Sequence, residues 1–120
     1  MAKDDFHVIV YQILAYLYQC LKKGVDIDTK MLSADSPYFI VHGNPLSDRY
    51  WCYILWQMES MGLIEGIMFS NRIDNLPFER PLRWNNCMIT PKGIEYLTDN
   101  SFIQKAKEFL RDVNSIIPFP

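Results

Sequence analysis

The sequence has few of the residues that build most active sites. It contains two histidines and three cysteines, and neither set has the short spacing that is typical of zinc or redox sites. Its five glycines are dispersed, so no glycine-rich loop is present to cradle a phosphate. We therefore expect no enzyme activity, no bound metal and no cofactor, and we interpret His42 as a loop residue.

Charge of one sign and long apolar runs are also missing. The formal net charge is −2 and is spread evenly, which is not the basic pattern of a strong nucleic-acid binder. No apolar run approaches the ~20 residues that span a bilayer, and the acidic N-terminus is unlike a signal peptide. An odd number of cysteines favours a reducing compartment. We expect a cytoplasmic protein without membrane contact.

What the sequence does contain is a large apolar fraction, 49% of 120 residues, which is enough for one domain over residues 1–120. Apolar residues recur at helical spacing from Phe6 to Leu21 and predict a first helix that stops at Gly24. A short second helix is expected through Met31 and Leu32, capped by an aspartate at 26 or 28. Residues 38–41 fit either a strand or a packed loop, with the strand slightly favoured.

The strongest local pattern lies at residues 47–66. Ser47 can cap the first turn of a helix, Asp48 suits the positive end of the helix dipole, and Gly62 permits the left-handed residue that ends the helix. We expect strands at about 63–69 and 84–89, joined by a long polar stretch at 70–83. A helix followed by such a hairpin is typical of the third helix and the wing of a winged helix.

Two further helices are expected in a C-terminal extension over residues 91–116. Thr90 can serve as N-cap with Pro91 at the first helical position. Ser101 and Gln104 have the spacing of a capping box for the last helix. The predicted fold is therefore α+β: a winged helix-turn-helix, with a three-helix core and a β-hairpin wing, plus additional C-terminal helices.

The stretch from Ile89 to Leu97, together with Tyr50-Trp51 and Gly62-Leu63-Ile64, resembles the YjcQ-like family of small bacterial and phage proteins. The resemblance covers about residues 6–114. It implies a fold similar to winged-helix DNA-binding domains, and it implies no particular reaction or ligand.

On the third helix, directing Trp51 and Leu55 to the core leaves Tyr53 and Trp56 facing outward. Three interpretations are open. The face could read bases in a major groove, it could anchor a protein partner or a second subunit, or the 37–45 connection or the last helix could cover it. The arginines of the wing could contact phosphates, although a solvated hairpin with scattered ion pairs is the simpler reading.

We expect a small binding protein with no enzymatic activity. The first hypothesis is a DNA-associated regulator that contacts double-stranded DNA, and the alternative is a protein-interaction module on the same scaffold, with self-association expected. The candidate DNA-binding residues are Arg49, Tyr53, Arg72, Arg80, Arg83 and Lys92. The candidate interface residues are Tyr53, Trp56, Phe102, Phe109, Val113 and Phe119.

Overall fold

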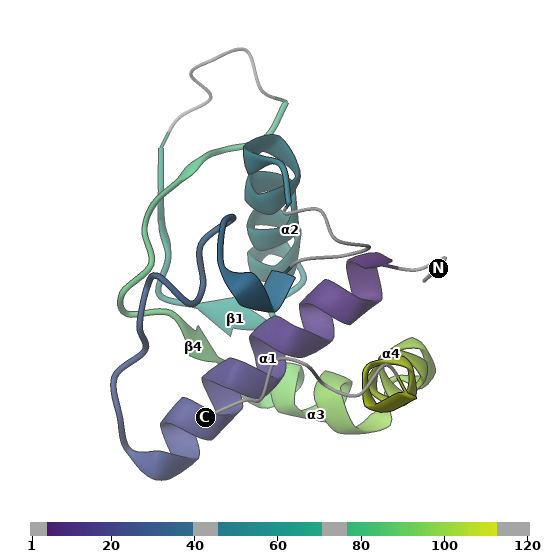
Figure 1. The fold of residues 1–120 in the computed structure, drawn as a ribbon. Helices are drawn as coiled ribbons and strands as arrows, with labels where there is room; N and C mark the ends of the chain where they lie inside the picture. Colours follow the sequence, from purple (N-terminus) through teal and green to yellow (C-terminus); the bar gives the residue numbers. More distant parts are fainter. Residues whose placement is uncertain (1–4, 40–45, 71–76, 113–120) are drawn as a thin grey trace.

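The longest element of the fold is helix α1, Asp5–Lys23, which crosses the middle of the molecule (Figure 1). The computed structural model describes residues 5–39, 46–70 and 77–112. Ile9, Ile13 and Leu14 of α1 have no exposed surface, because the helix contacts elements on several of its sides. The predicted first helix is confirmed, and its apolar side forms the centre of the core.

The chain after α1 forms consecutive turns instead of the expected second helix, so that prediction is wrong. Met31 N donates to Asp28 O at 2.9 Å and Leu32 N to Thr29 O at 3.2 Å, both bonds spanning three residues. The Asp28 carboxylate also accepts from Lys30 N at 3.0 Å, and such a local bond competes with helical pairing. A short 3₁₀ helix, η1, follows at Pro37–Phe39 in place of a strand, and residues 40–41 lie outside the described part.

Helix α2, Asp48–Ser60, matches the expectation at both ends. The Ser47 hydroxyl accepts from Tyr50 N at 3.1 Å, and Gly62 has a φ of 79°. The predicted inward side is confirmed. Its buried residues are Trp51, Cys52, Ile54, Leu55 and Met58. The Trp51 ring lies 5.4 Å from the ring of Phe39, which joins η1 to this helix.

The hairpin consists of four short strands instead of two long ones. They are β1 (Ile64–Glu65), β2 (Met68–Phe69), β3 (Pro81–Arg83) and β4 (Met88–Ile89). β1 pairs antiparallel with β4, with Ile64 opposite Ile89, and β2 pairs antiparallel with β3. Gly66 separates β1 from β2 with a φ of 93°, and a side chain there would collide with the Asn86 carbonyl. The expected strand start at residue 84 is wrong, because β3 precedes it and residues 84–87 turn.

Helices α3 (Pro91–Asp99) and α4 (Ser101–Asp112) account for the described part of the C-terminal extension, whose last residues, 113–116, lie outside it. The Thr90 cap is confirmed, since its hydroxyl accepts from Gly93 N at 2.9 Å. The capping box is wrong by one residue: Asn100 Oδ1 accepts from Phe102 N at 2.9 Å and from Ile103 N at 3.1 Å. The asparagine side chain caps the first turn of α4, a role that Ser101 was expected to fill.

Figure 1 shows α1 between two groups of elements, with α2 and the hairpin on one side and α3 and α4 on the other. Among the described residues, the molecule is therefore a compact α+β protein with four α-helices and two small antiparallel sheets. In this arrangement α2 carries Arg49, Tyr53 and Trp56, and the other described candidate residues lie on the hairpin, α3 and α4.

Candidate interaction surface

The outward side of α2 is partly covered by Phe78, a residue of the hairpin that is 6% exposed. Its ring lies 5.6 Å from Tyr53 in an edge-on geometry and 6.1 Å from Trp56. Tyr53 keeps 37% of its surface exposed, whereas Trp56 is half-buried against the core. The hairpin, through Phe78, therefore supplies the cover that the structure describes for these two aromatics. Most of the 37–45 connection, which was one expected source of cover, lies outside the described residues.

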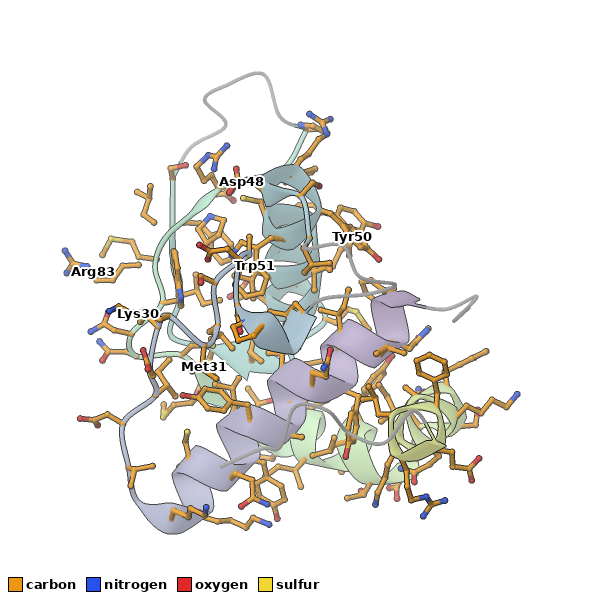
Figure 2. All side chains as sticks on the ribbon, viewed as in Figure 1. Lys30, Met31, Asp48, Tyr50, Trp51 and Arg83 are labelled. Carbon is orange, nitrogen blue, oxygen red and sulfur yellow. The ribbon has the colours of Figure 1, made fainter. Side chains whose placement is uncertain are left out.

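Arg49 and Tyr50 complete this surface at the start of α2. The Arg49 guanidinium lies 5.7 Å from the centre of the Phe78 ring, within the range of a cation–π contact. Tyr50 stacks on Tyr53 with ring centres 6.5 Å apart, and Figure 2 shows Tyr50 on the side of α2 opposite Arg83. These residues line a hollow of about 250 Å³ with Ser47. We call Arg49, Tyr50, Tyr53 and Phe78 the α2 aromatic face.

Arg80 is tied to α2 by an ion pair. Its Nη1 donates to Asp48 Oδ2 at 2.7 Å and lies 3.7 Å from the sulfur of Cys52. Burial, and next the negative charge of Asp48, raise the pKa of the Cys52 thiol. Arg80, a candidate DNA-binding residue, is thus paired with the Asp48 carboxylate of the same molecule.

The other candidate DNA-binding residues lie on separate elements. Arg83 is exposed on β3 and points away from the ribbon in Figure 2. Lys92 is exposed in the first turn of α3, where its side chain passes close to Gly62. Arg72 lies outside the described residues. Their roles in binding stay predictions.

The candidate interface residues near the C-terminus lie partly on α4 and partly outside the described residues. Phe102 is 52% exposed and stacks on His7 of α1 at 5.0 Å. Phe109 is half-buried, and Val113 and Phe119 lie outside the described residues. The side of α4 that enters the core is carried by Ile103 and Ala106. The exposed ring of Phe102 is therefore available as an apolar contact on the surface of α4.

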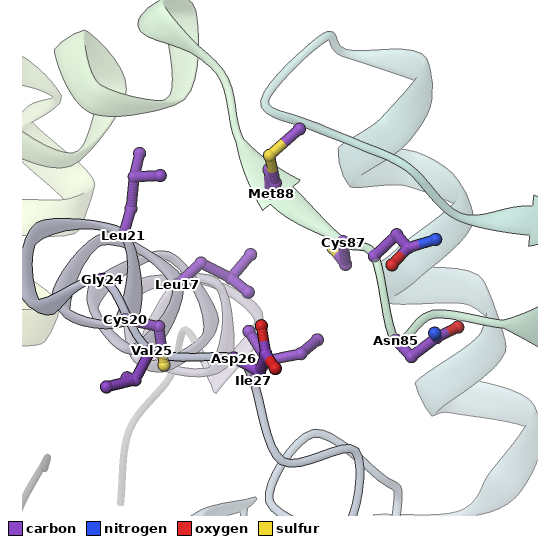
Figure 3. A pocket seen from close by; sticks show the side chains of 11 residues that line it. Leu17, Cys20, Leu21, Gly24, Val25, Asp26, Ile27, Asn85, Cys87 and Met88 are labelled. Atoms are coloured by element: carbon purple, nitrogen blue, oxygen red, sulfur yellow. The ribbon is translucent and has the colours of Figure 1, made fainter.

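An apolar hollow of about 470 Å³ lies between the end of α1 and the start of β4 (Figure 3). Leu21, Val25 and Met88 at its edge are each about half exposed. Cys20 and Cys87 line it as buried free thiols, and burial raises the pKa of Cys87 to about 12. The Cys87 thiol therefore stays protonated near neutral pH, and both cysteines serve as small apolar residues.

The described residues hold no group of three or more histidines, cysteines, aspartates or glutamates that could bind a metal ion. Within the same part of the chain, no helix combines the length and the apolar character needed to cross a membrane.

Sequence reasoning missed two hairpin residues: Phe78, which packs on α2, and Trp84, which contacts the turns after α1. Phe78 closes the short run Leu76-Pro77-Phe78 inside a segment that is mostly polar, and this was its available signal. Trp84 donates its indole N–H to Thr29 O at 3.4 Å and so joins the hairpin to the turns after α1. Neither contact follows from local spacing, because each links segments far apart in the sequence.

The fold and its surface define a small α+β domain whose conspicuous features are an aromatic surface and shallow hollows. Its family follows from the sequence: the profile of the YjcQ protein family matches residues 11–116, and the chain belongs to this family. The family resemblance expected from the sequence is thereby confirmed. No curated protein and no solved structure matches the chain at a significant level.

Proposed function

We propose that the protein is a binding module without enzymatic activity, built on a winged-helix plan, which acts by docking a protein partner on the α2 aromatic face. The order of its elements supports this plan: α1, a turn segment in place of a second helix, α2, and then an antiparallel hairpin. In such a scaffold α2 occupies the place of the recognition helix.

The position of Phe78 carries the proposal. A helix that reads bases must present an open side to a major groove about 12 Å wide. Here the Phe78 ring rests on Tyr53 and Trp56, in the middle of that side. The same packing holds an aromatic surface in a fixed geometry, which lowers the entropic cost of docking a partner.

The composition of the face suits a protein partner better than a duplex. Tyrosine, tryptophan and arginine are the residue types that most often dominate binding at protein interfaces, and Arg49 and Tyr53 are both exposed. Asp48 and Glu59, exposed on the same helix, would repel phosphates. Arg80 partly offsets only the first of these charges.

Site-specific photo-crosslinking in cells tests the proposal. A photoreactive phenylalanine analogue at position 53 should give a discrete protein adduct, because Tyr53 lies on the proposed interface. The same analogue at Glu95, exposed on α3, is the matched control. The proposal also predicts that Arg49→Ala weakens the adduct at position 53. Equal crosslinking at 53 and 95, or none at 53, would contradict it.

Double-stranded DNA is the second candidate partner, and the exposed cation Arg83 on the hairpin supports it. Figure 2 shows Arg83 and Lys30 both pointing outward on the side of the molecule opposite Tyr50. This arrangement would allow contact with phosphates through the wing, without base reading by α2. Affinity for a duplex should then fall with salt at a slope near −0.9 for each phosphate contact, and Arg83→Ala should flatten that slope.

A further inference from the structure

A separate pocket of about 450 Å³ lies where the turn segment, the start of α2 and the hairpin meet. Figure 2 labels Asp48 and Trp51, which belong to its wall. Its charged and aromatic lining residues are Asp35, Asp48, Trp51, Arg80 and Trp84. Its volume falls in the range of small-ligand sites, and it shares no residue with the α2 aromatic face.

The aromatic wall of this pocket is fixed in place. Trp84 is half-buried, and its indole N–H donates to Thr29 O at 3.4 Å. This hydrogen bond holds the ring between the hairpin and the turns that follow α1. Trp51 is 3% exposed and packs against Phe39 beneath it. The exposed part of the Trp84 ring offers a π surface for a flat or cationic group.

The polar side of the pocket has more acceptors than donors. Asp35 is exposed, and its Oδ1 accepts from Ser33 Oγ at 2.8 Å. Asp48 pairs with Arg80 through Oδ2, while its side chain keeps 64% of its surface exposed. A carboxylate has about four acceptor positions, so both aspartates retain capacity for further donors. Among the described lining residues, two carboxylates against one guanidinium give a net negative charge.

We propose that this pocket binds a guanidinium group. A guanidinium is always charged, donates hydrogen bonds in a fork that matches a carboxylate, and stacks on an indole. It would place its N–H groups toward Asp35 and Asp48 and its plane against Trp84. A simple ammonium would satisfy the charge but would use the aromatic wall less well. The cations Lys30 and Arg83 point outward and are absent from the pocket lining.

Calorimetric titration with N-acetylarginine amide tests this assignment. The citrulline analogue, which replaces the guanidinium by a neutral urea group of nearly the same shape, is the matched control ligand. We expect the arginine compound to bind about tenfold more tightly or better, as is typical of hydrogen bonds between charged groups. Free arginine distinguishes the source: tighter binding of it indicates a free amino acid, and equal binding indicates the side chain of a protein segment.

Asp35→Asn is the decisive variant. Asparagine keeps an oxygen for the Ser33 hydroxyl but loses the charge, so the fold should be retained while affinity falls about tenfold. Asp26→Asn, at an exposed carboxylate outside this pocket, should leave the affinity unchanged. Equal binding of the arginine and citrulline compounds, unchanged binding by Asp35→Asn, or no saturable binding overturns the assignment. These outcomes do not depend on the α2 aromatic face.

Discussion

The Thr90 hydroxyl donates a hydrogen bond to the carbonyl of Gly62 at 2.5 Å and accepts one from Gly93 N at 2.9 Å. One side chain thereby joins the residue that ends α2 to the first turn of α3. The Thr90 amide also donates to Leu63 O at 3.0 Å, so backbone and side chain bind the same segment. This junction sets the direction in which α3 leaves the hairpin.

Thr90→Ala should lower the free energy of unfolding by about 1 kcal/mol or more, because α3 loses its cap and the Gly62 carbonyl loses a donor. Thr90→Ser keeps the hydroxyl and is the matched control. Urea unfolding followed by circular dichroism measures both variants. If serine and alanine destabilise the protein equally, the hydroxyl does not hold this junction.

Trp51→Ala should remove roughly 3–5 kcal/mol of stability, because a side chain that is 3% exposed leaves a cavity next to Phe39. Tyr53→Ala removes a more exposed ring from the same helix and should cost much less. Thermal melting compares the two variants with the parent. A Trp51→Ala protein that melts like the parent would show that this side of α2 is not the core side.

The stability of the protein should decrease at alkaline pH because of Cys87, whose pKa is raised by burial from 9.0 to about 12. Between these values the folded state keeps a proton that the unfolded state has released. The free energy of unfolding therefore falls as pH rises above about 9, by up to about 1.4 kcal/mol per pH unit. Below pH 9 the thiol is protonated in both states, and the stability that comes from burying it is fully present.

Cys87→Ala should flatten that dependence in urea unfolding measured between about pH 8 and pH 10.5. Tyr16, whose pKa burial also raises to about 12, remains in the variant, so the difference between the two curves reports Cys87 alone. Identical slopes for the variant and the parent would mean that the thiol is not buried as described.

Self-association through α4 remains a prediction, and the exposed ring of Phe102 supports it. Light scattering at micromolar concentration should give about twice the chain mass of 14.2 kDa. Phe102→Asp should return the mass to that of one chain without unfolding the protein, because the ring contributes mainly a surface contact to His7. A parent protein that already has the mass of one chain would rule out the dimer.

Local signals predicted the parts of the fold that depend on nearest neighbours. The hydroxyls of Ser47 and Thr90 each accept a hydrogen bond from the amide three residues ahead. Their position just before a segment with helical apolar spacing predicts this capping role. The end of α2 at Gly62 follows from the same local chemistry. Asn100 shows the limit of this reasoning, since asparagine and the adjacent Ser101 are both good caps and only the structure decides between them.

The elements that sequence reasoning placed wrongly depend on distant contacts. Gly66 divides the expected strand because the Asn86 carbonyl lies against it, 20 positions along the chain. The turns around Asp28 are held by Tyr16, whose hydroxyl accepts from Asp28 N at 2.7 Å. Phe78 reaches α2 from a segment that reads as polar. The sequence therefore predicted that Tyr53 and Trp56 lie on the same side of a helix, but it did not predict that Phe78 packs on them.

We propose that α2 meets a protein partner and does not read DNA through the side that Phe78 covers. The most direct measurement compares Arg49→Ala with Arg83→Ala in fluorescence anisotropy with a labelled duplex at low salt. We expect Arg49→Ala to leave any duplex affinity and its salt slope unchanged, and only Arg83→Ala to reduce them. A loss of about tenfold or more for Arg49→Ala in the folded protein, larger than that for Arg83→Ala, would contradict the claim.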